Sequence, residues 1–342
     1  MSKDLQLAQA ALAKGIAAFN AGDHAAAAEH LAVATRADPE NVEAHHYLGG
    51  VDFHAGRFPE ALRRFEIACR LAPNRPQMYI DKAMAHSKLG ENEAARQCAE
   101  KAALLDPQSV PTHDLLAAFT FSGPTYADLL RMFHSHLQPR TYVEIGVSAG
   151  VSFVLVPESV RAIGIDPEPK VTAPLGPNSS IYPMTSDEYF ATRDVAGDLG
   201  GLPIDLAFID GMHQFEFALR DFINVEKYSS ARSTVLIHDC YPLTRISAER
   251  ERQTLFWTGD IWRLILILRK YRPDLSVSVI GAWPTGLGIV RQLDPGSTVL
   301  AEHMQEILEE YLAMDYSVLD ADKPGMLARY PNDWEKIKLL LG

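Results

Sequence analysis

The sequence predicts two folded regions of different class: an α-helical repeat array at the N-terminus, followed by an α/β region with a largely parallel sheet. Two observations lead to this prediction. Prolines recur at a fixed spacing in the first third of the chain, and short β-rich runs alternate with helical stretches from Thr141 onward. Such alternation is typical of parallel sheets with crossover helices. With 342 residues, of which 47% are hydrophobic, the chain can bury the cores of two or more domains.

The N-terminal region repeats with a period of 34 residues. Pro39, Pro73 and Pro107 lie 34 residues apart, and the segments before them align without a gap. Proline stops a helix, glycine ends one, and small residues let two antiparallel helices approach closely. We therefore expect three helix pairs over residues 1–107. The aligned small residues are Ala27, Ala61 and Ala95; Ala34, Ala68 and Ala102; Gly15, Gly49 and Ala83 in the first helices; and Gly22, Gly56 and Gly90 in the turns.

This pattern resembles the tetratricopeptide repeat, which has a period of 34 residues. One helix pair cannot bury its apolar face alone, whereas three stacked pairs can, and they leave a concave surface that often binds a partner. The resemblance implies a protein partner or self-association through residues 1–107. A simple spacer between other parts of the molecule is the alternative.

The rest of the chain divides into three further parts. Residues 108–140 are expected to form a connector and a helix that docks on the next domain, residues 141–295 the α/β domain, and residues 296–342 a helical extension. Gly or Asp ends four of the first five predicted strands. In open α/β sheets, ligands bind beyond the carboxyl ends of the strands, so these residues form the candidate site. The strands are predicted near 142–146, 162–166, 181–184, 205–210, 234–239, 275–280 and 287–291, and helices of the extension near 301–314 and 334–341.

Charge and composition exclude several classes of protein. A formal net charge of −12 argues against non-specific binding to nucleic acid, which needs a basic surface. The three cysteines include no CxxC pair, so neither a disulfide framework nor a structural zinc site is indicated. Polar residues interrupt the Ala-rich start, which argues against a signal peptide, and the most apolar internal stretch, residues 264–268, is too short to span a bilayer. We expect a cytoplasmic protein without a membrane span.

The first candidate binding motif follows the first predicted strand. It runs from Glu144 through Gly146 to Gly150, so backbone N–H groups can approach a ligand beside a carboxylate. Asp166 closes the next strand about 20 residues later, where an acid can accept hydrogen bonds from ribose hydroxyls. Asp187, after the third strand, is placed to line an adenine pocket.

Together these residues resemble the cofactor site of class I S-adenosylmethionine-dependent methyltransferases, which have a Rossmann-like, seven-stranded domain. The resemblance implies that Gly146 and Gly150 shape the loop beside the amino-acid end of the cofactor, that Glu144 lies near its floor, and that Asp166 binds its ribose. An NAD-binding enzyme is the alternative. That alternative predicts a third glycine and a helix N-terminus that can bind a phosphate group. This chain instead has Val147, Ser148 and Ala149 after Gly146.

The second candidate motif lies on the fourth and fifth predicted strands. Asp210 ends one apolar strand and Asp239 ends the next, so both carboxylates should lie in the same cleft. Paired carboxylates suit Mg²⁺ or another hard divalent cation, which prefers oxygen ligands. His213 begins the following helix, and an imidazole is a competent general base. Either aspartate alone is better explained as a helix cap, but the pair together with His213 favours chemistry.

Residues around this motif receive structural interpretations. His238 lies just inside a strand end and is interpreted as a satisfied core histidine. The basic stretch of residues 245–272 could rim the substrate pocket and favour an anionic acceptor, or form a solvated amphipathic helix. Helical spacing assigns Phe215, Leu219 and Phe222 to the core, and Glu216, Arg220 and Asp221 to a solvated face.

The segments 206–221 and 235–241 resemble the IDGxH and HD segments of a methyltransferase subgroup, family 24-like, that includes cephalosporin-hydroxylase-like and macrolide-sugar O-methyltransferases. The resemblance covers residues 141–292. It implies that Asp210 and Asp239 bind a metal ion and that His213 deprotonates the acceptor hydroxyl. We therefore predict O-methylation of a hydroxyl on a sugar or small polar metabolite, with S-adenosylmethionine as cofactor and Mg²⁺ or another divalent cation as an aid. The alternative is a scaffold whose second domain binds cofactor without turnover or methylates a protein.

Overall fold

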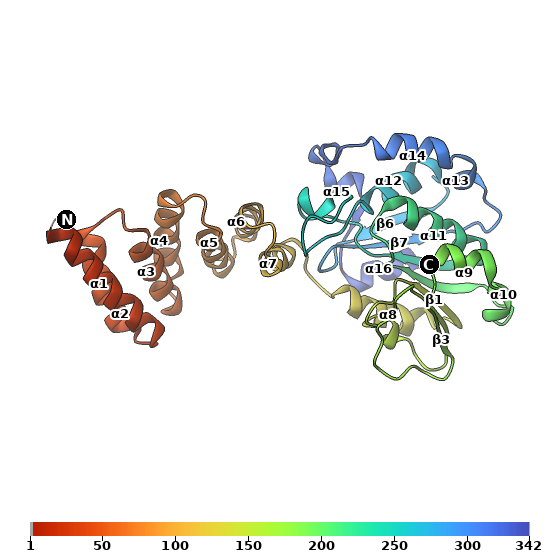
Figure 1. Ribbon diagram of the computed structural model, residues 1–342, viewed down its shortest axis with the longest axis horizontal. Coiled ribbons are helices and arrows are strands. Elements are labelled where there is room, and N and C mark those ends of the chain that lie inside the picture. The colour runs from red at the N-terminus through yellow and green to blue at the C-terminus, as the bar shows by residue number, and fades with distance from the viewer. Residues whose placement is uncertain (1–2, 342) are drawn as a thin grey trace. The chain divides into compact units, whose positions relative to one another are not determined.

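The computed structural model describes residues 3–341 and divides into two units, one ending at Thr120 and the other beginning at Phe121 (Figure 1). The structure places the helix at Val110–Thr120 in the first unit and the helix at Tyr126–Leu137 in the second. Residues 108–140 were predicted to form a connector and one docking helix. The docking helix is confirmed, but the connector part itself forms a helix, which belongs to the first unit. None of the helices within residues 3–341 is long and apolar enough to cross a membrane.

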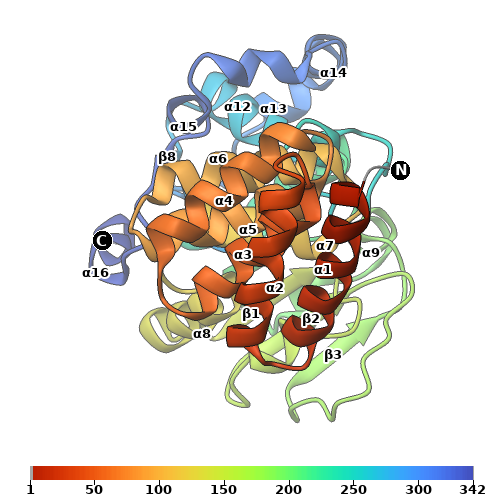
Figure 2. The same ribbon diagram turned by 90° about the vertical axis from the view of Figure 1, so that its left-hand side faces the viewer.

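The first unit is a stack of antiparallel helix pairs (Figure 2). Asp23 and Asn41 cap the second and third helices by accepting hydrogen bonds from the backbone N–H groups of Ala26 and Ala44. The helices occur in the predicted order of three pairs, and one further helix follows them. The helices are α1 (Lys3–Asn20), α2 (His24–Ala37), α3 (Val42–His54), α4 (Phe58–Leu71), α5 (Pro76–Lys88), α6 (Asn92–Leu105) and α7 (Val110–Thr120).

Small residues set the distance between the paired helices. A Cβ atom added at Gly15 would lie 2.6 Å from Cγ of Leu31, and one added at Gly49 would lie 2.5 Å from a ring carbon of Phe65. Glycine is therefore required where the partner helix carries a large side chain. The turn glycines Gly22, Gly56 and Gly90 have positive φ angles of 79°, 73° and 78°. The predicted roles of these residues are confirmed.

The second unit is built on one sheet with the strand order β3-β2-β1-β4-β5-β7-β6-β8. The pairs β3–β2, β2–β1, β1–β4 and β4–β5 are parallel, whereas β7 is antiparallel to both of its neighbours. This mostly parallel sheet is consistent with the predicted Rossmann-like fold. The strands are β1 (Thr141–Ile145), β2 (Arg161–Ile165), β3 (Ser179–Tyr182), β4 (Ile204–Ile209), β5 (Ser229–Ile237), β6 (Ser276–Ile280), β7 (Leu287–Arg291) and β8 (Arg329–Tyr330).

The structure corrects three details of the predicted sheet domain. All seven predicted strands form, but the C-terminal extension adds an eighth, β8, which pairs with β6. The connection from β1 to β2 contains a short 3₁₀ helix, Phe153–Leu155, where a full crossover helix was expected. The predicted helix near 301–314 is interrupted at His303, which separates α13 (Val299–Glu302) from α14 (Met304–Leu312).

Helices cover both faces of the sheet. Leu129 and Phe133 of α8 (Tyr126–Leu137) and Ile337 of α16 (Trp334–Leu341) pack in one core with alternate residues of the central strands, including Tyr142 and Phe208. The intervening residues point to the opposite face. There, α11 (Phe215–Lys227) and α12 (Trp262–Tyr271) contact strands β4, β5 and β6. The remaining helices are α9 (Ser186–Thr192), α10 (Val195–Asp198) and α15 (Lys323–Met326), with 3₁₀ turns at Ile246–Ala248 and Tyr316–Asp320.

Candidate active site

A cavity of about 810 Å³ lies beyond the carboxyl ends of the parallel strands. The winding of the sheet reverses at β1, whose neighbours are β2 and β4, and this switch point is where open α/β sheets bind ligands. The volume falls within the ~300–1,000 Å³ range of small-molecule sites. The lining residues follow the strand ends: Ile145, Gly146, Ser148; Ile165, Asp166, Pro167; Thr185, Ser186, Asp187; Asp210, Gly211, Met212, His213, Phe217, Asp221; His238, Asp239; Leu255, Phe256, Trp257; and Pro284, Thr285.

The turn after β1 is held tightly against the turn after β4. Gly146 has a φ of 89°, and a Cβ atom at this position would overlap the backbone carbonyl of Asp210. Asp166, at the end of β2, is 9% exposed and accepts hydrogen bonds of 2.7 Å from the backbone N–H groups of Ser148 and Glu168. Each carboxylate oxygen has a second lone pair. Asp166 therefore fixes the loop and retains acceptor capacity at the cavity surface.

Glu144 and Gly150 do not line the cavity. Glu144 is fully buried, and its two oxygens accept hydrogen bonds from the hydroxyls of Tyr142 (2.6 Å) and Ser152 (2.7 Å). Burial raises the pKa of Glu144 to about 8, against the opposing effect of these hydrogen bonds. Gly150 has a φ of 80° and faces Val171. Both residues hold the loop in place from behind the cavity.

Two aspartates lie beside each other near the β3 end of the cavity. Asp187, in the first turn of α9, lines the cavity and forms an ion pair of 2.9 Å with Arg220. Asp221 also lines the cavity and is 3% exposed, so the prediction that it belongs to a solvated face is wrong. Burial raises its pKa to about 7. Phe217, four residues earlier on the same face of α11, lines the cavity as well, and that spacing was the available signal.

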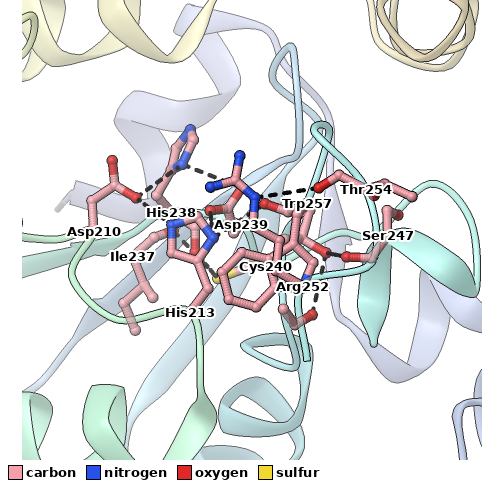
Figure 3. Close-up of polar contacts among 12 residues, drawn as sticks. Asp210, His213, Ile237, His238, Asp239, Cys240, Ser247, Arg252, Thr254 and Trp257 are labelled. Carbon is pink, nitrogen blue, oxygen red and sulfur yellow. Dashed lines mark hydrogen bonds and ion pairs between the residues drawn. The ribbon is translucent and has the colours of Figure 1, made fainter. Parts of the chain in front are cut away.

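Asp210, His213 and Asp239 converge at the other end of the cavity, as the strand positions predicted (Figure 3). His213 Nδ1 lies 3.3 Å from Asp239 Oδ2, and His213 Nε2 lies 3.8 Å from Asp210 Oδ1. Asp239 has a φ of 60°, a left-handed conformation that Asp tolerates better than most residues and that is frequent at functional sites. Burial alone would raise the pKa of Asp239, but the nearby His238 and His213 outweigh it and lower that pKa.

His238 belongs to this cluster, so its interpretation as a satisfied core histidine is wrong. Its Nδ1 lies 3.2 Å from Asp210 Oδ1 and 3.3 Å from Asp239 Oδ1 (Figure 3). Its Nε2 is buried without a hydrogen-bond partner among the described residues, and its ring packs 4.5 Å from that of Tyr126. Burial would lower the pKa of His238, but the charges of the two aspartates outweigh it and raise that pKa well above its ordinary value.

The segment before α12 fixes the orientation of His213. Its ring stacks on Trp257 at 5.0 Å, and its Nδ1 lies 3.1 Å from the Trp257 carbonyl oxygen. A carbonyl only accepts, so the hydrogen bond places the proton on Nδ1 and leaves Nε2 as the acceptor of the neutral ring. The N–H of Asp260 donates to the carbonyl of His213, and the buried Asp260 carboxylate accepts from the N–H of Phe215 at the start of α11.

Three residues of the cluster could hold a metal ion. One ligand atom each from Asp210, His213 and Asp239 lies within 4.8 Å of the others. Oxygen ligands bind Mg²⁺ at ~2.0–2.1 Å and Ca²⁺ at 2.3–2.6 Å, so two ligands of one ion lie up to roughly 4–5 Å apart. The arrangement therefore fits a hard divalent cation in size and in its carboxylate ligands.

Among the described residues, the basic side chains that line the cavity are two histidines, His213 and His238. Five aspartates line it, whereas no Lys or Arg of the described residues does. Three arginines of residues 245–272 are engaged elsewhere: Arg250 pairs with Glu216, Arg263 with Asp260, and the buried Arg272 with Glu226. Arg252 instead contacts two lining residues, since it donates to the carbonyl of Leu255 at 3.2 Å and lies 5.8 Å from the centre of the Trp257 ring. No Lys or Arg of the basic stretch therefore lines the cavity, and Arg252 contacts its wall.

Comparison with known families agrees with this organisation. Residues 143–240 match the family model of a methyltransferase domain, and residues 12–76 and 76–109 match two tetratricopeptide repeat models. The chain thus combines a tetratricopeptide array with a methyltransferase domain. No curated protein sequence matches it significantly.

Several solved structures are similar to about a third of the chain. The crystal structure of MamA is 20% identical, with a TM-score of 0.32, and the match covers 33% of this chain and 66% of MamA. The first tetratricopeptide domain of Spaghetti (RPAP3), bound to the HSP90 peptide SRMEEVD, is 22% identical over 34% of this chain and 91% of that one, with a TM-score of 0.33. The TPR2B domain of yeast Sti1 in complex with pHsp70 is 21% identical over 32% and 94%, with a TM-score of 0.31.

Proposed function

From an architecture of tetratricopeptide repeats followed by a methyltransferase domain, we propose that this protein transfers a methyl group from S-adenosylmethionine to a hydroxyl group of a small acceptor. One observation carries the proposal. A single cavity of about 810 Å³ holds Asp166 at the end of β2, and Asp210, His213 and Asp239 at the ends of β4 and β5. A candidate ligand site and an acid–base cluster therefore share one cavity.

The residues present fit the cofactor. Asp166 would bind the ribose hydroxyls with its remaining lone pairs, Asp187 and Asp221 would bind at the adenine side, and the loop that begins at Gly146 would lie beside the amino-acid end. Glu144 and Gly150 would support this loop from behind. When bound, S-adenosylmethionine supplies a methyl group on a positively charged sulfur. A cavity lined by five aspartates and no Lys or Arg of the described chain suits a cationic ligand.

His213 is the proposed general base. Trp257 holds its ring by stacking and by the Nδ1 hydrogen bond, so the Nε2 lone pair can take the proton of the acceptor hydroxyl. Asp239, 3.3 Å from Nδ1, would stabilise the imidazolium that forms. The cavity would hold the acceptor oxygen in line with the methyl group, which reduces the entropic part of the barrier.

A divalent cation on Asp210 and Asp239 is the proposed aid to this base. The metal chemistry would lower the pKa of the acceptor hydroxyl. The two roles compete at one atom, because an imidazole that binds a metal through Nε2 has no lone pair left for the proton. The proposal therefore assigns the metal to the two carboxylates and the proton to His213.

The lining of the cavity supports an uncharged acceptor such as a sugar. Met212 and Leu255 are 55% and 65% exposed, and Phe256 and Trp257 lie beside them on the wall next to His213. An acceptor with hydroxyls and apolar faces matches this combination of aspartates and apolar side chains. A phosphorylated or carboxylated acceptor has no Lys or Arg partner among the described lining residues, and the imidazole of His238 already pairs with Asp210 and Asp239.

The tetratricopeptide repeats indicate a protein partner and support a second candidate function. In that alternative, the repeats bring a protein to a methyltransferase domain that methylates it, or that binds cofactor without turnover. A protein substrate would require both units in one chain, whereas a small acceptor would not.

Isothermal titration calorimetry with S-adenosylmethionine and S-adenosylhomocysteine tests the cofactor site without knowledge of the acceptor. We expect Asp166→Ala to weaken binding by about 10- to 100-fold, the effect of leaving charge-assisted hydrogen bonds unmade. Asp205→Ala is the matched control, because Asp205 also accepts a backbone N–H, that of Arg140 at 2.9 Å, but sits at the opposite end of β4. Equal affinities of the two folded variants would contradict the assignment.

A further inference from the structure

The repeat unit contains a cavity of its own. Its volume is about 330 Å³, at the lower end of the ~300–1,000 Å³ range of ligand sites. The first helices of the three pairs, α1, α3 and α5, lie side by side along the stack and form most of it (Figure 2). We call it the aromatic pocket, and it is lined by Phe19, His46, Tyr47, Gly50, Phe53, His54, Phe65, Gln77, Asp81 and Met84.

Aromatic rings form the walls of the aromatic pocket. The rings of Phe19 and Tyr47 meet edge to face at 5.3 Å, and Phe65 lies 6.1 Å from the ring of His46. A Cβ atom at Gly50 would lie 3.0 Å from Phe19 Cζ, so glycine at this position lets the Phe19 ring rest against α3. Phe19 and Tyr47 are only half-buried. Their ring surfaces are therefore available to a ligand.

One carboxylate supplies the charge of the aromatic pocket. Asp81 Oδ1 accepts a hydrogen bond of 3.0 Å from the Gln77 amide, and Asp81 Oδ2 lies 2.5 Å from His46 Nε2. Both donors are neutral when the imidazole is unprotonated, so they orient the carboxylate without cancelling its charge. Each oxygen keeps a second lone pair for a ligand. Neither Lys nor Arg is found among the ten lining residues or along α3, the central helix of the pocket.

We propose that the aromatic pocket receives an arginine or lysine side chain from an extended segment of a partner protein. A cation over aromatic faces is attracted by the negative face of the rings, and a guanidinium adds hydrogen bonds to a carboxylate. Acidic peptides and nucleic acids have no Lys or Arg partner on this lining. The tetratricopeptide repeats already indicate a protein partner, and the pocket specifies which part of it is recognised.

The test follows the methyl signal of Met84 in the full chain, labelled with ¹³C at its methionine methyl groups and assigned with Met84→Leu. The probes are three capped pentapeptides with two alanines on each side of a central arginine, citrulline or glutamate. Citrulline has the shape of arginine without its charge. We expect the arginine peptide to shift the Met84 signal in a saturable way, and the citrulline peptide to bind at least about tenfold more weakly.

Variants identify the carboxylate as the recognition group. Asp81→Asn should lower the affinity for the arginine peptide by about 10- to 100-fold, and Asp81→Glu should restore part of it. Asp52→Asn removes a carboxylate of the same unit that pairs with Arg57 and does not line the pocket, so it should leave the affinity unchanged. The proposal is overturned if arginine and citrulline peptides bind alike, if the glutamate peptide binds best, if no peptide moves the Met84 signal, or if folded Asp81→Asn binds arginine as wild type does.

Discussion

The two units differ in what they bury. Within residues 3–120 the buried polar side chains are three histidines and one threonine, and no carboxylate is buried. The sheet unit buries six carboxylates: Glu144, Asp166, Asp221, Glu226, Asp239 and Asp260. Three of them, Asp166, Asp221 and Asp239, line the cavity at the strand ends. Burying a charge is unfavourable unless it is paired or hydrogen-bonded. The repeat unit is therefore stabilised mainly by apolar packing, whereas the sheet unit buries carboxylates, half of them at its cavity.

The largest effect that should separate the units concerns catalysis. His213→Ala is expected to lower the rate of methyl transfer by about 10²–10⁴, the range for loss of a general base, with little change in cofactor affinity. His46→Ala, a matched change in the repeat unit, should leave the transfer rate to a small acceptor unchanged. Radiolabelled methyl transfer to any acceptor that the wild-type chain methylates provides the measurement.

Treatment with a chelator in the same assay separates the contribution of His213 as a base from the contribution of a bound metal ion. If His213 acts with a metal on Asp210 and Asp239, a chelator slows the wild-type enzyme, and Asp210→Asn removes that sensitivity. Full activity of His213→Ala together with resistance to chelation would assign the cluster to structure alone.

The second effect is a difference between the two units in how their free energy of unfolding depends on pH. The pKa of Glu144 rises from 4.5 to about 8 on folding, so the folded state binds this proton more tightly than the unfolded state. Its stabilising effect is complete below pH 4.5 and is lost as the pH rises through 8. Between pH 6.5 and 8 this change amounts to about 2 kcal/mol, since one proton contributes at most ~1.4 kcal/mol per pH unit.

The unfolding of each unit can be measured separately, because all four tryptophans lie in the sheet unit: Trp257, Trp262, Trp283 and Trp334. Tryptophan fluorescence should show a lower denaturation midpoint at pH 8 than at pH 6.5, and Glu144→Gln should reduce this slope. The repeat unit, followed by helical circular dichroism in a chain of residues 1–120, should change far less. An unchanged slope in Glu144→Gln would contradict the assignment of the proton.

The third effect tests close packing in the repeat unit. Alanine at position 49 would gain ~1 kcal/mol of helix propensity but would overlap the Phe65 ring, and overpacking typically costs about 1–3 kcal/mol. We expect Gly49→Ala to destabilise the repeat unit by about 1 kcal/mol while the tryptophan signal of the sheet unit stays unchanged. Gly176→Ala is the control, because its Cβ atom would meet its neighbours only at 3.5 Å or beyond.

The smallest expected effect is on cofactor affinity after removal of the repeats. A chain that begins at Phe121 should stay folded, because the sheet unit has its own core. Its affinity for S-adenosylmethionine should remain within about twofold of that of the full chain, or less than ~0.5 kcal/mol. Aggregation, or loss of binding in calorimetry, would show that the two units share a core.

The sequence predicts local patterns well and long-range neighbours less well. The 34-residue spacing specifies the helix pairs because each Gly and Pro acts on its own turn. The strand ends predict the convergence of Asp210 and Asp239 because parallel strands share one edge. Three features of the site were not predicted, because they depend on side chains from distant segments. They are the burial of Asp221, the contacts of His238 and the position of Glu144 behind its loop. Strand β8 has only two residues, too few for a pattern, so nothing in the sequence separated it from a loop.

That short strand has a consequence for anyone who shortens the chain. β8 pairs with Val279 and Ile280 at the end of β6, and β6 has the alternating sequence Ser-Val-Ser-Val-Ile. Without the extension, Val279 and Ile280 would also be uncovered, and the whole of β6 would form a sheet edge of high β-propensity. Such edges pair with other molecules and promote aggregation. The C-terminal extension therefore covers one end of this sheet edge, and a truncation before Arg329 should be accompanied by a lysine on the exposed face of β6.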